Sequence, residues 1–423
     1  MTKLDLSDHD DLPLLPIGTV LWMCPNLKQF RYSHKIIFPS QSIGTLGTSS
    51  LTSLTVLELS FRGFRGNCLE TIIPRCPKLR VLILDQCRSS TLSLIQEHCH
   101  NLKYLVFNHY NADYSWMEYD KEGQDYSSES NEQEKGGLQH IIINLYDLDY
   151  FIPLLNQHRH TIKKLEMSLN IFDAGHGQDF STLAGELTRL DHLEISYTEA
   201  PHIVMTLLEK TPFIESLYFI NSDLCDDNMI TAITQLKYLK ALHISNKCDM
   251  LIGDIQRLLH HFASKAAEDN GSSSQQQQQH QGQTLQEIRL HDCNFINDDL
   301  VMSLLDIPSL TKIQLGTCRR VTSRGMNMFL QYLYRLPMIN ELSIANRLVT
   351  RSGLAYLHNV KTLKKVKLIE IEGVTHEDIN ELRDAIDGQV IYDHQFGFIQ
   401  GESDMEEDDD DDVEDEDEDD GWI

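Results

Sequence analysis

No stretch of the sequence holds the roughly eighteen consecutive apolar residues that a membrane-spanning helix needs. The first residues are acidic, with Asp5, Asp8, Asp10 and Asp11, and they lack an apolar core of signal-peptide length. None of the nine cysteines forms a Cys-x-x-Cys pair, which disfavours a zinc site or a disulfide framework. Free thiols fit a reducing compartment. We therefore expect a protein of the cytoplasm or nucleus that neither crosses nor binds a membrane.

Residue groupings typical of catalysis or cofactor binding are also missing. The phosphate-binding loop G-x-x-x-x-G-K-[ST] does not occur. Histidines with a neighbouring cysteine or histidine occur at His98–Cys99, His158–His160, His260–His261 and His291–Cys293, but no third group stands at the spacing of a catalytic triad or a metal site. These histidines favour packing or solvated helix ends. We expect a non-enzymatic protein with no catalytic residue, no metal and no cofactor.

Basic residues are few, because 36 lysines and arginines stand against 64 acidic residues and give a net charge of −28. Sixteen acidic residues lie between Glu402 and Asp420, a run without any basic residue, so the rest of the chain carries −28 + 16 = −12. Nucleic-acid binding needs clustered lysine and arginine, so this balance disfavours it. Like charges repel, so residues 400–423 are expected to form a disordered acidic tail that either attracts basic proteins or folds back weakly on lysines and arginines of the solenoid.

The main feature that the sequence does contain is a repeat. Leu285, Ile288, Leu290 and Cys293 stand at offsets zero, three, five and eight, and the same pattern begins again at Leu310, 25 residues later. The two central apolar residues are two positions apart, so both point to one face of a short strand. This is the strand pattern L-x-x-L-x-L-x-x-C of a leucine-rich repeat. Since one repeat cannot bury its apolar face alone, further copies are expected on both sides.

About thirteen copies follow one another, mostly 23 to 29 residues apart. They predict an α/β leucine-rich-repeat solenoid, a right-handed horseshoe with parallel strands on its concave face and short helices outside. The core of a solenoid grows with the number of repeats, so most of the 423 residues fit one domain. The predicted strands begin at Leu27, Leu54, Leu79, Leu102, Leu138, Ile162, Leu190, Ile214, Leu239, Leu285, Leu310, Ile339 and Leu363.

Two long gaps break the rhythm of the repeats, and both are polar. We expect disordered insertions near residues 111–137 and 264–283, the second with five consecutive glutamines. The predicted domains are a partial repeat or cap over residues 1–23, whose strand is missing, the solenoid over 24–399, and the acidic tail over 400–423. Residues 389–392 are expected to add a final strand or capping element.

The helices of the last repeats have recognisable starts. Val-Thr-x-x-Gly occurs at residues 321–325 and 349–353, and Val-Thr-His-Glu-Asp occurs at 374–378. Threonine is a favoured N-cap residue, so helices are predicted to begin after Thr322, Thr350 and Thr375. Asp378 stands three residues after Thr375 and fits a variant of the capping box.

Three features together resemble the cysteine-containing leucine-rich repeats of the F-box/LRR proteins: Cys76-Pro77-x-Leu79 before a strand, cysteine after a strand, and Val-Thr-x-x-Gly before a helix. The resemblance covers about residues 23–386. It implies a substrate-recognition subunit of an SCF-type, cullin-RING ubiquitin ligase in ubiquitin-dependent protein degradation. No F-box is recognisable before Leu27, so binding to the SCF adaptor is implied only if an F-box lies upstream.

A second resemblance joins leucine-rich repeats to an acidic tail. This combination is similar to the Ran GTPase-activating proteins and to the acidic nuclear proteins that bind histones. Their repeats usually carry asparagine at offset eight, and here only Asn170 does so. The type of repeat therefore favours the F-box/LRR family, with the acidic-tailed proteins as the alternative.

A protein partner is expected on the concave face, where the residue at offset four of each strand projects. The first few of these residues after residue 80 are apolar, and exposed apolar patches often mark binding sites. The alternative is that β-branched residues simply suit strands. The predicted partner-binding residues are Ile83, Val106, Ile142, Tyr218, His243 and Arg289.

Overall fold

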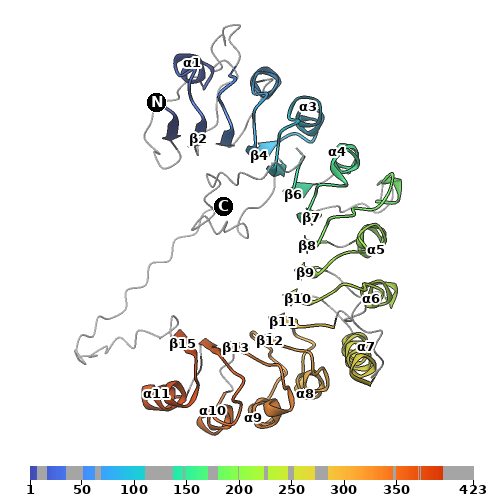
Figure 1. Cartoon of the computed structure of the whole chain (residues 1–423), viewed down its shortest axis with the longest axis vertical. Helices are drawn as coiled ribbons and strands as arrows, with labels where there is room; N and C mark the ends of the chain where they lie inside the picture. Colours follow the sequence, from blue (N-terminus) through green and yellow to red (C-terminus); the bar gives the residue numbers. More distant parts are fainter. Residues whose placement is uncertain are drawn as a thin grey trace, which may run out of the picture.

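The computed structural model of this protein describes residues 1–6, 17–34, 51–61, 68–109, 137–145, 148–169, 180–198, 200–222, 227–245, 252–271, 284–345, 349–369, 371 and 373–393. These residues form an α/β leucine-rich-repeat solenoid that curves into a horseshoe (Figure 1). The expected acidic tail and the stretch 110–136, which holds nearly all of the first expected insertion, lie outside the described residues. None of the described helices is both long enough and apolar enough to cross a membrane.

One parallel sheet runs through the whole described part of the chain, and each of its fifteen strands pairs with the next strand in sequence. The sheet lines the inner side of the horseshoe (Figure 1). The strands are β1 (Lys3–Leu6), β2 (Gln29–His34), β3 (Val56–Phe61), β4 (Val81–Cys87), β5 (Tyr104–His109), β6 (His140–Leu145), β7 (Lys164–Leu169), β8 (His192–Ser196), β9 (Ser216–Ile220), β10 (Ala241–Ser245), β11 (Glu287–His291), β12 (Lys312–Leu315), β13 (Glu341–Ala345), β14 (Lys365–Ile369) and β15 (Gln389–Asp393).

Short helices and 3-10 turns return the chain along the outer side of the horseshoe (Figure 1). They are α1 (Ile17–Met23), α2 (Cys68–Ile72), η1 (Ile73–Arg75), α3 (Thr91–His98), α4 (Phe151–His158), η2 (Phe180–Thr182), α5 (Pro201–Glu209), α6 (Asp227–Thr234), α7 (Ile252–Gly271), α8 (Asp298–Ser303), η4 (Leu304–Asp306), α9 (Ser323–Tyr332), η5 (Leu333–Arg335), α10 (Arg351–Leu357) and α11 (His376–Ala385).

The thirteen predicted strands correspond to β2 through β14, and the expected final strand is β15. The strand expected to be missing from the first repeat is present as β1, so that prediction was wrong. Strand β1 pairs Leu4 with Phe30 and Leu6 with Tyr32, in register with β2. Met1 aligns with Leu27, so the N-terminal sequence follows the repeat pattern with methionine in place of the first leucine.

Helix α7 corrects the boundary of the second expected insertion. Disorder was expected from residue 264, but α7 continues to Gly271, and residues 272–283 lie outside the described part of the chain. The sequence from Ala263 to Glu268 is rich in alanine, the strongest helix former. Phe262 and Ala266 are buried, four positions apart, so this helix also has a face to pack.

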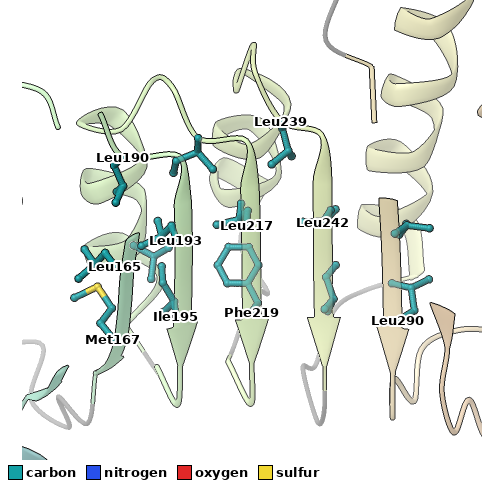
Figure 2. Close-up of a cluster of buried hydrophobic side chains, with 14 of the residues drawn as sticks. Leu165, Met167, Leu190, Leu193, Ile195, Leu217, Phe219, Leu239, Leu242 and Leu290 are labelled. Carbon is teal, nitrogen blue, oxygen red and sulfur yellow. The ribbon is translucent and has the colours of Figure 1, made fainter. Parts of the chain in front are cut away.

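The core lies between the sheet and the helices and is built from the repeated apolar positions. Figure 2 shows these side chains stacked from one strand to the next across β7 to β11. Leu193, Leu217 and Leu242 stand side by side through strand pairing, and each is fully buried. Ile195, Phe219 and Ile244 form the next such row, two positions further along each strand, and are also buried. Each repeat therefore completes its core only by contact with its two neighbours.

Six cysteines in the described part of the chain are free thiols, as expected: Cys24, Cys76, Cys87, Cys99, Cys293 and Cys318. All except Cys24 are buried. The Cys76 thiol donates a hydrogen bond to the Ile72 carbonyl oxygen at 3.3 Å. Burial raises the pKa of Cys76, Cys99 and Cys318 to about 12. These three side chains are uncharged packing groups at neutral pH and do not supply a nucleophile.

The predicted N-caps of the last repeats are confirmed. Thr322 and Thr350 accept hydrogen bonds from the backbone amides of Gly325 and Gly353, at 3.0 Å and 3.2 Å. Thr375 forms the expected capping box with Asp378. Each threonine thereby satisfies a backbone amide at the start of its helix.

The glycine of Val-Thr-x-x-Gly has a separate role, which is to make room for a side chain of the preceding repeat. Asp298, from α8, accepts hydrogen bonds from the Thr322 amide at 2.7 Å and from the Thr322 hydroxyl at 2.6 Å. A methyl group on Gly325 would overlap the carboxylate of Asp298. The motif therefore couples the start of one helix to the helix before it.

We expect Gly325→Ala to lower the free energy of unfolding by about 1 to 3 kcal/mol, because the new methyl group displaces Asp298 and weakens two hydrogen bonds. Urea unfolding followed by circular dichroism measures the change. The matched control is Gly253→Ala in α7, where no neighbouring group lies within 4 Å of the added methyl. That change is expected to stabilise by about 0.5 to 1 kcal/mol. Equal effects of the two substitutions would contradict this role of Gly325.

Candidate functional site

Two rows of side chains face the concave side of the sheet, and strand pairing fixes their order. The row at offset four has the register expected from the sequence, so the six predicted partner-binding residues lie in one continuous row. In order this row is Asp5, Arg31, Glu58, Ile83, Val106, Ile142, Glu166, Glu194, Tyr218, His243, Arg289, Gln314, Ser343, Lys367 and Ile391.

The row at offset two lies beside it on the same face. It runs Lys3, Gln29, Val56, Val81, Tyr104, His140, Lys164, His192, Ser216, Ala241, Glu287, Lys312, Glu341, Lys365 and Gln389. The sequence analysis took only the offset-four residues as candidates. The same period of two that placed those residues on the concave face also places this second row there.

The concave face begins with the ion-paired residues Asp5, Arg31 and Glu58, and an apolar sector follows them. Val56, Val81, Tyr104 and Val106 form a buried cluster, against which Ile83 and Ile142 pack as half-buried neighbours. Only 1% of the Val106 surface is exposed, so the expectation that Val106 faces solvent was wrong. The cause is lateral packing, because apolar side chains of both rows meet at the same strands.

The next sector begins with Glu166, a carboxylate that is held by two partners. Lys164 donates to Glu166 Oε1 at 2.6 Å, and His140 Nε2 lies 3.2 Å from the same oxygen. Burial alone would raise the pKa of Glu166, but the hydrogen bonds from His140 and Lys164 and their charges lower it to about 2. Glu166 is therefore ionised at neutral pH.

Glu194 stands next to Glu166 on the adjacent strand, and it differs from Glu166 because the charge of Lys164 acts on it only without direct contact. No hydrogen bond or ion pair joins the Glu194 carboxyl to any residue in the described part of the chain. Burial, followed by the charge of Glu166, raises the pKa of Glu194 to about 7. His192, on the same strand, does not compensate, because burial and the charge of Lys164 lower its pKa to about 4. Glu194 is a half-buried carboxyl that an added cation would stabilise in its charged form.

An aromatic group follows Glu194 along the row. The ring of Tyr218 lies 4.6 Å from the ring of His192 and 3.8 Å from the ring of His243. His243 is buried, and burial lowers its pKa, which favours the neutral ring. The two predicted residues Tyr218 and His243 are thus in direct contact. Their rings give the concave face a rigid aromatic platform beside Glu194.

The sector around Glu287 is charged but internally compensated. Glu287 Oε1 lies 3.0 Å from His243 Nε2 and 3.5 Å from Lys312 Nζ, and it also accepts a hydrogen bond from Arg289. Burial alone would raise the pKa of Glu287, but the hydrogen bond from His243 and the charge of Arg289 outweigh it and lower the pKa to about 2. Lys312 and Lys365 continue the chain of ion pairs through Glu341, at 3.6 Å and 3.3 Å. Arg289, the last predicted residue, therefore belongs to a structural network.

The histidine runs do not form a metal site within the described part of the chain, where no group of three or more potential ligands occurs. His158 is buried, so the interpretation as a solvated helix end was wrong for this residue. Burial and the nearby His100 lower the pKa of His158 to about 4. Its Nδ1 accepts a hydrogen bond from the Leu138 amide at 3.4 Å, which ties α4 to the start of β6.

Comparisons with known proteins do not assign this chain to a family. No family model matches the sequence, and no curated protein matches it. An internalin (inlF) from Listeria monocytogenes is 12% identical with a TM-score of 0.40, over 92% of this chain and 86% of that one. A chain of the yeast Rad7–Elc1 complex is 14% identical with a TM-score of 0.43, over 92% of this chain and 80% of that one. A chain of the TLR13–ssRNA13 complex is 13% identical with a TM-score of 0.41, over 81% of this chain and 46% of that one. This protein therefore spans less than half of the TLR13 complex chain.

Proposed function

We propose that this protein is a non-enzymatic protein-binding scaffold that recognises a partner protein on its concave face. The observation that carries the proposal is Glu194, a half-buried carboxyl that makes no hydrogen bond or ion pair with any residue in the described part of the chain. It lies between the apolar sector that ends at Ile142 and the aromatic platform of Tyr218 and His243. A buried charge without a partner costs stability, so such a group is better explained by a partner than by the fold.

The chemistry of the neighbouring sectors defines the partner segment. A lysine or arginine would pair with Glu194 and lie against the ring of Tyr218, where a cation is attracted by the aromatic face. An apolar side chain of the same segment would contact Ile142 and Ile83. Ile142 and Glu194 are two strand spacings apart, which is roughly 10 Å, or about three residues of an extended chain. The proposed ligand is a protein segment with an apolar residue about three positions from a basic one.

We expect Glu194→Lys to invert the charge preference of the concave face. The measurement is selection of a random twelve-residue peptide library, displayed on phage, against the whole protein and against the variant. Wild type should enrich peptides with lysine or arginine about three positions from an apolar residue, and the variant should enrich aspartate or glutamate at that position.

The matched control for this selection is Glu209→Lys, the same charge change on the exposed side of α5. It should select the same peptides as wild type. Selection of the same basic peptides by Glu194→Lys, or of no common motif by wild type, would contradict the assignment of Glu194.

Within this function, we propose the role of a substrate-recognition subunit in an SCF-type, cullin-RING ubiquitin ligase in the cytoplasm or nucleus. The repeat type supports this role, because cysteine after the strand and Val-Thr-x-x-Gly before the helix are typical of the F-box/LRR proteins. The test is co-purification of the adaptor and cullin subunits with the protein expressed from its own gene. Recovery of a concave-face partner that contains no ligase subunit would keep the scaffold function and exclude the ligase role.

A further inference from the structure

The edge of the sheet where the strands begin is strongly basic over the first part of the solenoid. The segments that lead into β2 through β7 are residues 24–28, 51–55, 76–80, 99–103, 137–139 and 159–163. They contain six lysines and arginines and no aspartate or glutamate. The corresponding segments before β8 to β15 are residues 183–191, 210–215, 235–240, 284–286, 307–311, 336–340, 358–364 and 386–388, where four acidic residues offset six basic ones. A basic surface of this kind is unexpected in a chain with a net charge of −28.

Backbone hydrogen bonds hold four of these basic residues in one row, which also contains Thr55 and Gln139: Lys28, Arg80, Lys103 and Lys163. The Arg80 amide donates to the Thr55 carbonyl oxygen, the Lys103 amide to that of Arg80, and the Lys163 amide to that of Gln139, each at 2.8 Å. We define the basic edge as Lys28, Lys78, Arg80, Lys103, Arg159 and Lys163. With a strand spacing of about 4.8 Å, the five steps from β2 to β7 make it roughly 24 Å long.

Most charges of the basic edge have no acidic partner in the described part of the chain. Lys28, Lys78, Arg80 and Lys103 take part in no ion pair there, and Lys78 and Arg80 are exposed. Arg159 donates hydrogen bonds to His160 Nε2 and to the Asn156 carbonyl oxygen, neither of which is a carboxylate. The basic edge therefore presents a positive potential that an acidic chain would neutralise.

The same chain carries such a segment within reach. The last strand ends at Asp393, and sixteen acidic residues follow between Glu402 and Asp420. The end of β15 and the start of β7 are separated by eight strand spacings along the sheet and by one strand length across it. Together these give a distance of roughly 42 Å. About twelve extended residues span that distance, which brings the chain to the densest part of the acidic run.

We propose that the acidic run Glu402–Asp420 docks on the basic edge of its own chain. Individual surface ion pairs contribute little, but a tethered segment binds as if its concentration were in the millimolar range. Duplex DNA would meet the same positive charge, yet it would be repelled by the net charge of −28. Docking within one chain therefore neutralises both the acidic run and the basic edge.

Zero-length carbodiimide crosslinking of the full chain at 50 mM salt, followed by mass spectrometry, tests this proposal. Carboxyls of Glu402–Asp420 should form amides with Lys28, Lys78, Lys103 and Lys163 at least fivefold more often than with Lys361 or Lys364 near the other end of the sheet. At 1 M salt, where the Debye length falls to about 3 Å, this preference should disappear. A mixture of isotope-labelled and unlabelled chains identifies crosslinks between chains.

Two matched variants keep every lysine that can react. Arg80→Gln with Arg159→Gln should lower crosslinking to the basic edge several-fold, whereas Arg319→Gln with Arg324→Gln should leave it unchanged. Even crosslinking over all lysines, or no effect of the first pair of substitutions, would refute the docking.

Crosslinks found only between different chains would assign the basic edge to a second copy. Submicromolar binding of a 20-base-pair DNA duplex at 0.15 M salt, lost in the Arg80 and Arg159 variant, would assign it to nucleic acid. Either assignment overturns the proposal.

Discussion

Replacing Phe219 by alanine is expected to lower the free energy of unfolding by about 3 to 5 kcal/mol, because the removed ring leaves a cavity in the core. Phe219 is fully buried in β9 beside Ile195 of β8 (Figure 2), and strand pairing places Ile244 of β10 on its other side. In a solenoid each repeat contacts only its neighbours, so the loss should stay local. Hydrogen exchange should accelerate roughly a hundredfold to several thousandfold at the backbone amides of β8 to β10.

The control is Ile220→Ala, one position further along the same strand, where the side chain is half-buried and points to the opposite face. It should change exchange in β8 to β10 less than tenfold. Amides of β13 and β14 should exchange at wild-type rates in both variants. Equal acceleration throughout the sheet would show that the repeats unfold as one cooperative unit and would contradict the local response.

Replacing Glu287 by glutamine is expected to destabilise the protein by roughly 1 to 3 kcal/mol at pH 7, because the charged partners Arg289 and Lys312 lose their shared carboxylate. The effect should depend on pH. The folded pKa of Glu287 is about 2, below its ordinary value of 4.5. Its contribution is therefore present above pH 4.5 and is lost as the pH falls toward 2.

Urea unfolding of wild type and Glu287→Gln at a series of pH values measures this contribution. The difference between the two proteins should be largest near neutral pH and should shrink below pH 4.5. Glu381→Gln, on the exposed face of α11, serves as the control and should change the free energy of unfolding by less than about 0.5 kcal/mol. A Glu287→Gln difference that stays constant down to pH 2 would contradict the assignment of the effect to the ionised carboxylate of Glu287.

The fold was predictable from sequence because its signal is repeated. One pair of apolar residues two positions apart is a weak signal. Its recurrence about every 25 residues predicts the strands, their register and the face of the sheet to which each side chain points. The first strand was missed because Met1 takes the place of the first leucine. The length of α7 was missed because the polar composition of residues 264–283 outweighed the alanines at their start.

The candidate site was predictable in position but not in chemistry. Strand geometry places Ile83 and Tyr218 on the concave face, whichever repeats lie beside them. Whether a side chain is buried or paired depends on neighbours that are 25 or more residues away in sequence. Val106 is buried by the second concave row, and Glu194 makes no ion pair in the described part of the chain while Glu166 has two basic partners. None of these relations follows from the sequence of a single repeat.

The central claim is that the concave face around Glu194 recognises a partner protein. The most direct measurement is quantitative affinity purification from the native cells with wild type, Glu194→Lys and the matched outer-face variant Glu209→Lys, each confirmed to melt like wild type. The account predicts that Glu194→Lys loses at least one partner that wild type and Glu209→Lys recover in equal amounts. Recovery of the same partners in the same amounts by all three proteins would contradict it.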